Sequence, residues 1–541
     1  MNPGRRRAIL IGAALGVVAI VVGAVVVLNS GGDTPPAEAG PATETGPVAG
    51  SPTSAAQEYI QDVAEGNTDA ASRLTDDPAG AGVALRDARN TLLPSKVTTS
   101  LTKVDPTPAG GTKAGGVFSI SWTLKPTKVW TYDVPFQVAL SGSNWRMHWT
   151  PALLHPKLEQ GQRLVIATGS QDAPAVVDRD GKPLVVSGPG GTRPADGNPA
   201  PMLRDALTAQ SPTAKSDGFA VQRVDASGKS LETMFGQTSS DSAKPVTASL
   251  SLAAQKSAQS AVDGYPGAAI LVAIQPSSGD ILAVAQNAAA GNSPKAFSGL
   301  YAPGSSFKIA TSVAALEAGL VTVNSSVDCP LSKQIGTRTV RNEDFELGTT
   351  TLHKAFAKSC NTTFGQLASE LDANGLKNAA DQLGLNADFE IPGISTELGK
   401  VDPAPGNDLR VEEGFGQGDL KVSPLGGAVM AATVAAGKPV TPKLFHGVDT
   451  TVVKGYSAPP ASILAQVRTM MREVVTGGTA TAAASAGQVF GKTGTAQFGD
   501  GTEASGWFVG YRGDVAFAVV LEKSNDSKPA VQLAAKFLNG L

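Results

Sequence analysis

Ser305 and Lys308 are three residues apart at the start of an apolar segment that is predicted to form a helix through Ala318. Residues three apart on a helix lie on the same face, so the lysine amine can reach the serine hydroxyl. A neutral lysine can act as the base for a serine nucleophile, and burial beside a second cation lowers the pKa of a lysine far enough for this. The pair alone is weak evidence, because Ser100 and Lys103 repeat the spacing where nothing else suggests catalysis.

Two further motifs follow in the chain and fit the same chemistry. Ser359-Cys360-Asn361 comes after a predicted helix at 352–358, and it offers a hydroxyl for proton relay and an amide that can hold a substrate carbonyl. Lys492-Thr493-Gly494-Thr495 follows Gln488-Val489-Phe490 and is predicted to lie on a strand. There the lysine supplies positive charge, the threonine hydroxyls can bind a carboxylate, and the glycine lets a substrate backbone approach closely. Each motif alone is commonly a solvated turn, but the three together predict a catalytic site built on Ser305.

Residues 245–541 contain the elements that would position these motifs. Apolar runs at 268–274 and 281–285, joined by a turn sequence, predict a β-hairpin. Ala-rich helical patterns follow, and strands are expected near 488–492, 506–511 and 515–521. Strands at both ends with helices between them predict an α+β domain.

The first 52 residues have the composition of a membrane anchor and a linker. Three arginines at 5–7 precede an uncharged stretch at 8–28, which is long enough to cross a bilayer as a helix. Because cationic flanks stay in the cytoplasm, we expect a cytoplasmic tail at 1–7, a transmembrane helix at 8–28 and the remainder outside. A cleaved signal peptide is the alternative, but its apolar region would be about half as long. Residues 29–52 are rich in Gly, Pro, Ala and Thr and predict a flexible linker.

Two smaller domains are expected between the linker and residue 245. Residues 53–156 combine a helical pattern at 56–64 with strands of alternating aromatic residues, which predicts a small α+β domain with one buried sheet face. Four of the five tryptophans fall here, and we expect them to pack in a core. Residues 157–244 show short strands at 176–177 and 184–186 among Gly- and Pro-rich loops, without recognisable chemistry.

Composition excludes several classes of protein. A chain of 541 residues is too long for one hydrophobic core, and 41% hydrophobic with 17% charged residues fits neither a disordered nor a polytopic membrane protein. The net charge of −3 argues against a nucleic-acid partner. With two cysteines and four histidines, neither a zinc site of four cysteines nor a His-rich metal centre is expected. Residues 486–493 read A-x-x-x-x-G-K-T, but a phosphate-binding loop is disfavoured because the first glycine is displaced to Gly487 and no helical pattern follows, so no cofactor is expected.

The three motifs resemble the signatures of penicillin-binding transpeptidases and serine β-lactamases. The segments 416–418, 423–425, 475–480 and 507–511 are most similar to class B penicillin-binding proteins. The segments 153–156 and 178–181 resemble the junction between the two smaller domains of the methicillin-resistance-type subgroup. The resemblance implies a multidomain α+β chain: a small amino-terminal domain at 53–156, a pedestal at 157–244, and a serine β-lactamase/transpeptidase-like domain at 245–541, with helices on both sides of an antiparallel sheet.

The resemblance also implies roles for the site residues. Ser305 would attack the penultimate D-Ala carbonyl of a peptidoglycan stem peptide, and an amine on a neighbouring stem would take the acyl group to form a crosslink. Backbone N–H groups of Ser305 and Thr495 would form the oxyanion hole. The remaining roles would be Lys308 as base, Ser359 as proton relay, Lys492 as fixed charge, Asn361 in orienting the substrate amide, Thr493 and Thr495 in holding the carboxylate, and Gly494 in close substrate approach.

The implied partners are D-Ala-D-Ala stem peptides, β-lactams as covalent inhibitors, the cell membrane through the amino-terminal helix, and a membrane glycosyltransferase as a candidate. Three alternatives share the core. A D-Ala carboxypeptidase or a serine β-lactamase fits less well, since no acidic deacylation motif is recognisable and the anchor with two further domains suits a wall synthase. A catalytically inactive scaffold fits less well because every motif residue is present.

Cys329 and Cys360 leave two interpretations open. Outside the cytoplasm a disulfide between them could persist and would fix the backbone between Ser359 and Asn361. Alternatively they are two separate buried thiols, since free cysteine packs as a small apolar residue. Geometry decides, because bridged cysteines have Cα atoms within about 7 Å.

Overall fold

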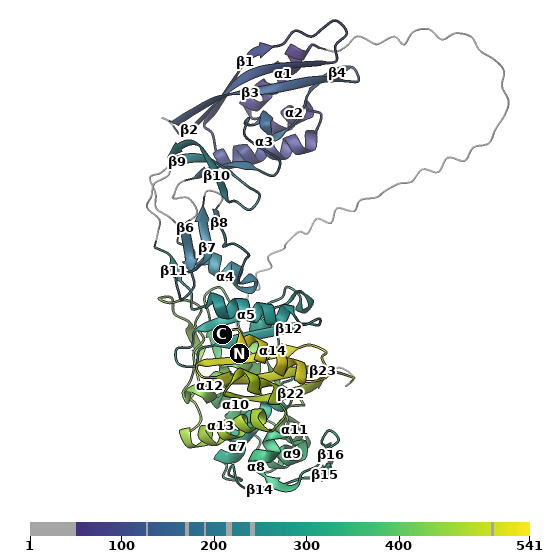
Figure 1. Cartoon of the computed structure of the whole chain (residues 1–541), viewed down its shortest axis with the longest axis vertical. Coiled ribbons are helices and arrows are strands. Elements are labelled where there is room, and N and C mark those ends of the chain that lie inside the picture. The colour runs from purple at the N-terminus through teal and green to yellow at the C-terminus, as the bar shows by residue number, and fades with distance from the viewer. Residues whose placement is uncertain are drawn as a thin grey trace, which may run out of the picture.

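The computed structural model describes residues 50–125, 128–167, 173–188, 191–212, 219–237, 244–498 and 502–541. The expected cytoplasmic tail, the expected transmembrane helix at 8–28 and the linker up to residue 49 lie outside these ranges. Within them, no helix is long and apolar enough to cross a membrane. Figure 1 shows a small domain at one end of the long axis, two small sheets in the middle and the largest domain at the other end.

The amino-terminal domain joins three helices and a four-stranded antiparallel sheet, β1-β2-β3-β4, around one core. Side chains of β2 alternate between the core and the other face, so Phe118, Ile120 and Trp122 are buried together. Trp130 is buried in the same core and Trp145 and Trp149 pack against it, which confirms the expected role of the tryptophans. The elements are α1 Pro52–Glu65, α2 Thr68–Arg73, α3 Pro78–Leu92, β1 Lys96–Val104, β2 Lys113–Lys125, β3 Lys128–Ser141 and β4 Asn144–Met147.

The middle segment divides its strands between two cores. The sheet β10-β9-β5 packs Leu164, Phe219 and Val221 into the core of the amino-terminal domain. The sheet β11-β6-β7-β8 packs Val176 and Leu184 into the core of the largest domain. The described part of this segment therefore connects the two larger units through shared apolar contacts. Its elements are β5 Arg163–Ala167, β6 Ala173–Val177, β7 Pro183–Gly188, β8 Gly191–Pro194, α4 Arg204–Ala209, β9 Phe219–Val224, β10 Ser230–Gln237 and β11 Val246–Thr247.

The largest domain is built on a five-stranded antiparallel sheet in the order β13-β12-β24-β23-β22. The predicted hairpin forms its first two strands, and the chain returns at the carboxyl end to add the other three. Helix α12 packs across one face, while α5 and α14 pack together against the other (Figure 1). This confirms the expected α+β architecture. The elements are α5 Leu252–Asp263, β12 Ala269–Ile274, β13 Ile281–Gln286, α12 Pro424–Ala436, β22 Val489–Phe498, β23 Glu503–Arg512, β24 Val515–Leu521 and α14 Lys528–Asn539.

A second, mainly helical region lies beside the edge strand β22. Its central helix, α7 Lys308–Glu317, is almost wholly buried, and Lys308 is the one charged residue among its buried side chains. The other α-helices are α6 Lys295–Ser298, α8 Leu352–Ala357, α9 Asn361–Ser369, α10 Gly375–Gln382, α11 Asn407–Gly414 and α13 Ala461–Thr476. Two short 3-10 helices are η4 Gly304–Phe307 and η5 Thr481–Ala486. The small strand pairs are β14 Ser326–Cys329 with β17 Gly348–Thr351, β15 Ser332–Ile335 with β16 Arg338–Arg341, β18 Asp388–Glu390 with β21 Thr451–Lys454, and β19 Gly399–Lys400 with β20 Lys421–Val422.

Two glycines hold the start of η4 against the segment after α11. The Gly304 N–H donates to the Gly416 carbonyl at 3.0 Å. A Cβ at Gly416 would lie 1.7 Å from the Gly304 carbonyl oxygen, and both residues have positive φ. Only glycine fits such an approach, which gives a physical reason for the 416–418 motif.

A buried carboxyl lies at the end of α11, just before this contact. Glu413 is 3% exposed, and its Oε2 has no hydrogen-bond partner among the described residues. Burial, followed by the charges of Asp419 and Asp402, raises the pKa of Glu413 from 4.5 to about 7. No sequence pattern predicted this buried carboxyl.

This pKa predicts a pH-dependent stability. A carboxyl with a higher pKa in the folded chain binds its proton more tightly when folded, so the free energy of unfolding should fall as the pH rises from 4.5 through about 7. We expect the melting temperature to fall over this range in calorimetry. Glu413→Gln should lose that part of the decline and be the more stable protein at pH 8, by about 1–3 kcal/mol.

Glu412→Gln is the matched control, since Glu412 is the neighbouring residue and forms an ion pair with Arg338. It should keep the decline between these pH values. Identical pH profiles for wild type and Glu413→Gln would contradict the assignment.

Candidate active site

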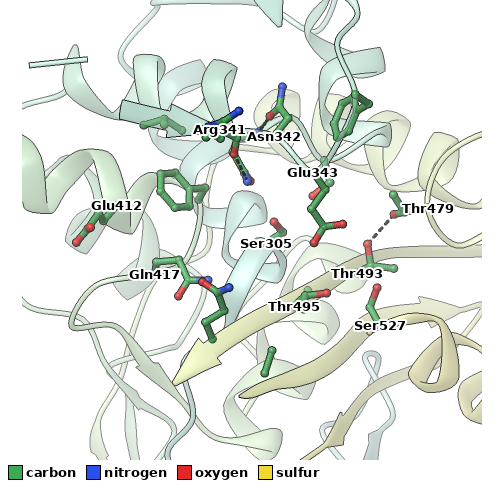
Figure 2. Close-up of a pocket in the computed structure, with 18 of the residues that line it drawn as sticks. Ser305, Arg341, Asn342, Glu343, Glu412, Gln417, Thr479, Thr493, Thr495 and Ser527 are labelled. Atoms are coloured by element: carbon green, nitrogen blue, oxygen red, sulfur yellow. Dashed lines mark hydrogen bonds between the residues drawn. The ribbon is translucent and has the colours of Figure 1, made fainter. Parts of the chain in front are cut away.

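The three sequence motifs meet in one cleft of about 1140 Å³ between β22 and the helical region (Figure 2). Ser305, Ser359, Asn361 and the threonines and glycine at 493–495 line it. Lys308 and Lys492 are fully buried beneath it. The structure thus brings together every residue that the sequence assigned to the site.

Ser305 lies one turn earlier than a simple helix start would place it. We expected it at the N-terminus of an α-helix, but it lies in η4, and α7 begins only at Lys308. Pro303 and the left-handed Gly304 tighten the chain into a 3-10 turn before the α-helix can form. The serine nonetheless lies at the opening of a continuous helical segment, where the first N–H groups lack helical partners.

The amine of Lys308 has a set of contacts that suits its neutral form. Its Nζ lies 2.7 Å from the Ser359 carbonyl oxygen and 2.7 Å from Oδ1 of Asn361. Both oxygens can only accept, so they take two N–H groups. The remaining tetrahedral position of the nitrogen faces Ser305 Oγ, which is 3.0 Å away. In a neutral amine a lone pair occupies that position and can accept the serine proton.

Electrostatics favour loss of the proton from Lys308. Burial lowers the pKa of Lys308 well below its usual value, and the positive charge of Lys492 lowers it further, while Glu343 opposes both. Burial also lowers the pKa of Lys492, to about 7. The Lys492 amine donates to Ser359 Oγ and to the Thr493 carbonyl, each at 2.9 Å. Since Lys308 Nζ is 3.3 Å from the same Ser359 Oγ, this hydroxyl lies between the two amines.

Ser359 is held in an unfavourable backbone conformation. Its φ of 64° is left-handed, which costs a residue with a side chain about 1–2 kcal/mol. Hydrogen bonds from the Ser359 and Cys360 N–H groups to carbonyls of α8 close the turn. This conformation lets the turn present both its hydroxyl and its carbonyl oxygen to the lysine amines.

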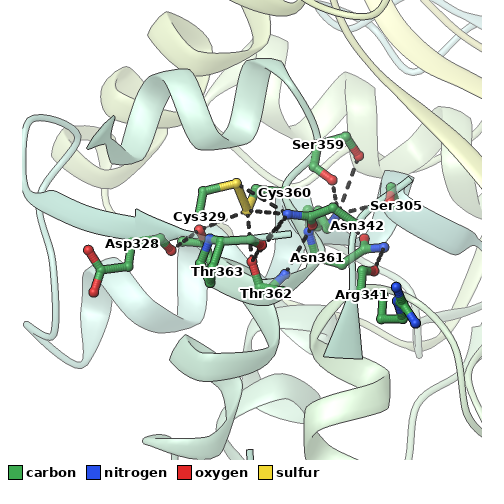
Figure 3. Close-up of a disulfide and its surroundings, with 12 residues drawn as sticks. Ser305, Asp328, Cys329, Arg341, Asn342, Ser359, Cys360, Asn361, Thr362 and Thr363 are labelled. Carbon is green, nitrogen blue, oxygen red and sulfur yellow. Dashed lines mark hydrogen bonds between the residues drawn. A yellow bond between two sulfur atoms is a disulfide. The ribbon is translucent and has the colours of Figure 1, made fainter. Parts of the chain in front are cut away.

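A disulfide ties this turn to β14 (Figure 3). Cys329 and Cys360 are bridged, with their Cα atoms 6.1 Å apart, so the bridged alternative is the one found. The sulfur atoms are fully buried beside Ala355 in a small apolar cluster. The bridge holds the middle residue of the motif from behind, away from the cleft.

Asn342 supports the same turn, and the sequence did not single it out. Its Oδ1 accepts from the Asn361 N–H at 2.7 Å, and its Nδ2 donates to the Pro330 carbonyl at 2.8 Å (Figure 3). It thereby satisfies a free N–H group at the start of α9. The side chain of Asn361 spans the turn, since its Nδ2 donates to the Arg341 carbonyl at 3.0 Å.

The β22 strand forms the opposite wall. A Cβ on Gly494 would lie 2.6 Å from the Pro303 carbonyl oxygen, so glycine is required for the strand to pack against the Ser305 turn. The Thr493 hydroxyl is 2.6 Å from the Thr479 hydroxyl (Figure 2). Thr479 and the exposed Glu343 also line the cleft, and the sequence did not identify either as a site residue.

Within the described ranges, no group of three or more His, Cys, Asp or Glu residues is arranged to hold a metal ion.

The chain matches two domain families. Residues 269–539 match the penicillin binding protein transpeptidase domain, and residues 51–162 match the NTF2-like N-terminal transpeptidase domain. The peptidoglycan D,D-transpeptidase PbpA of Mycobacterium tuberculosis is 29% identical over 308 residues, which cover 47% of this chain and 62% of the relative. PbpA of Mycolicibacterium smegmatis is 30% identical over 261 residues, covering 43% and 52%. The chain thus spans less than two thirds of the length of these relatives.

Two solved structures share the fold. PBP2 of Pseudomonas aeruginosa, in complex with WCK 5153, superposes with a TM-score of 0.55 at 21% identity, covering 69% of this chain and 96% of that one. Penicillin-binding protein A of M. tuberculosis, a ceftriaxone acyl-enzyme complex, gives 0.54 at 20% identity, covering 69% and 98%. The fold is therefore that of the penicillin-binding transpeptidases. Since the first domain match covers half of the 541 residues, the chain belongs to the penicillin binding protein transpeptidase family.

The disulfide predicts a redox-dependent stability. The bridge joins residues 31 apart in sequence, for which the chain-entropy argument gives about 3–4 kcal/mol. We expect dithiothreitol to lower the melting temperature of the wild-type protein. The double variant Cys329→Ser/Cys360→Ser should melt at the lower temperature with or without reductant. Equal melting temperatures for all four samples would show that the bridge contributes nothing to stability.

Proposed function

We propose that this chain is a membrane-anchored peptidoglycan D,D-transpeptidase that works through an acyl-enzyme on Ser305 and is acylated by penicillins. The observation that carries the proposal is the Lys308 amine, 3.0 Å from Ser305 Oγ with two carbonyl-type acceptors for its N–H groups. The names of the PbpA relatives and the acyl-enzyme structure of a fold neighbour support the same reaction.

Acylation begins when Lys308 takes the proton of Ser305 as Oγ attacks the carbonyl of the penultimate D-Ala. The oxyanion is held by the N–H groups of Ser305, at the opening of the helical segment, and of Thr495, on the edge strand β22. The C–N bond then breaks, and the leaving D-Ala amine receives a proton through Ser359. Contact of Ser359 Oγ with both lysine amines supports this relay role.

Substrate is held by the groups around the serine. The Asn361 amide keeps one N–H for a substrate carbonyl while its other contacts fix its orientation. Thr493 and Thr495 bind the terminal carboxylate, and charged Lys492 beneath them supplies the opposite charge. Gly494 leaves the strand backbone open to the substrate.

The domain arrangement completes the proposal. Residues 8–28 anchor the chain in the cell membrane with 1–7 in the cytoplasm, and the linker at 29–52 carries the three domains outside. A membrane glycosyltransferase that supplies glycan strands is the candidate partner. Nothing in the cleft favours the carboxypeptidase, β-lactamase or scaffold alternatives over crosslinking.

The first test is covalent labelling at Ser305. After penicillin treatment, intact-mass analysis should detect one adduct, which should be absent in Ser305→Ala. Ser306→Ala is the matched control, since the Ser306 hydroxyl is buried and bonds to the Pro303 carbonyl. An adduct that persists in Ser305→Ala would refute the assignment.

The second test separates the two lysines by pH. The second-order rate constant of penicillin acylation should fall as the pH rises through about 7. Above that pH Lys492 loses the positive charge that holds the carboxylate of the penicillin. Lys492→Arg should keep part of the activity and lose this alkaline decline, since guanidinium stays charged. Lys308→Arg should abolish acylation at every pH, because guanidinium cannot act as the base. Equal losses in both variants would contradict this division of roles.

A further inference from the structure

Glu343 places an unpaired carboxylate in the cleft. It follows β16, its side chain is exposed, and Figure 2 shows it directed toward Ser305 and Thr493. It forms no hydrogen bond or ion pair with the described residues. The other two glutamates that line the cleft are paired, Glu412 with Arg338 and Glu503 with Lys523. Glu343 is therefore the one glutamate of the described cleft that is free to meet a ligand.

The acylation step does not explain this carboxylate. Its charge raises the pKa of Lys308, which works against a neutral base. It also faces Thr493, where the proposed function places the carboxylate of the donor peptide, and two like charges repel. A negative charge at this place favours an incoming cation, and its other use, as a base toward water, would serve hydrolysis.

The second half of the proposed reaction brings such a cation. The acceptor is an amine, which is an ammonium ion near neutral pH, and it must enter on the side that the leaving D-Ala has vacated. We propose that Glu343 binds the ammonium group of the acceptor and positions it beside the acyl carbon of Ser305. This inference rests on the proposed function and adds to it a binding site for the acceptor.

The step balances as follows. The bound ammonium releases one proton to solvent, and the resulting amine forms a C–N bond to the acyl carbon. As the C–Oγ bond of Ser305 breaks, the second proton of the amine passes through Lys308 to Oγ. The products are an amide crosslink and the free serine. Glu343 ends the cycle ionised and ready for the next acceptor.

The test measures how the acyl-enzyme divides between acceptor and water. The full-length protein is acylated with a D-Ala thioester at pH 8, with either 1,5-diaminopentane, which is cationic, or hydroxylamine, which is uncharged. Glu343→Gln should lower the ratio of aminolysis to hydrolysis about tenfold for the diamine, as loss of one charge pair in a partly shielded site predicts. The loss should appear in the diamine concentration needed for half-maximal aminolysis. The hydroxylamine ratio should stay within about twofold, since no charge pair is involved.

Two further variants complete the test. Glu346→Gln is the matched control, because Glu346 is exposed in the same loop and does not line the cleft, so it should leave both ratios unchanged. Glu343→Asp should keep part of the preference for the diamine. An unchanged diamine ratio in Glu343→Gln would overturn the inference while leaving acylation and the proposed function intact. Selective loss of hydrolysis would also overturn it and assign the carboxylate to water activation. A wild-type protein that neither the thioester nor penicillin acylates would refute the proposed function itself.

Discussion

The site depends on two lysine amines buried on either side of one serine hydroxyl. Lys308 and Lys492 both contact Ser359 Oγ, and neither side chain is exposed to solvent. Two ammonium ions so close together and out of water repel each other and lack hydration, so the pair does not keep both charges at neutral pH. The contacts of Lys308 with two carbonyl-type oxygens and with Ser305 favour the neutral form there. A base and a fixed charge thus arise from two residues of the same type.

The scaffold is organised to keep these amines together. Helix α7, the turn before α9 and the strand β22 come from distant parts of the chain. The two lysine side chains join them at Ser359, and close backbone contacts surround the serine turn. Gly494 against Pro303, and Gly416 against Gly304, leave no room for a Cβ. The left-handed Ser359 stores strain that Asn342 and the disulfide of Cys360 hold in place. These contacts keep the Ser359 turn from changing its backbone conformation, so its hydroxyl and carbonyl oxygen stay in contact with the lysine amines.

Local patterns allowed much of this to be predicted from the sequence. The Ser305–Lys308 contact follows from helical spacing, and the place of Lys492 on a strand follows from the apolar residues before it. Apolar runs joined by a turn predicted the hairpin of β12 and β13, and alternating aromatic residues predicted that Trp122 packs in a core. Asn342, Glu343 and Thr479 were missed because their positions depend on tertiary packing that no periodicity reveals. The pKa of Glu413 depends on burial and on the charges of two aspartates. The disulfide depends on a distance in space that spacing in sequence does not determine.

The charges of the cleft also differ between its floor and its rim. The floor carries the two amines, which suits an anionic donor and a negatively charged transition state. The rim carries Glu343, which disfavours that donor and suits a cationic acceptor. A hydrolase needs no charged subsite to bind water, and it could use the carboxylate only as a base. A transferase that must receive an anion first and a cation second can use both, provided that the acidic group lies far enough from the serine to leave Lys308 neutral. The exposed position of Glu343 meets that condition, because solvent screens its charge. The charge of the buried Lys492 acts on the Lys308 amine more strongly, and the pKa of Lys308 stays well below its usual value.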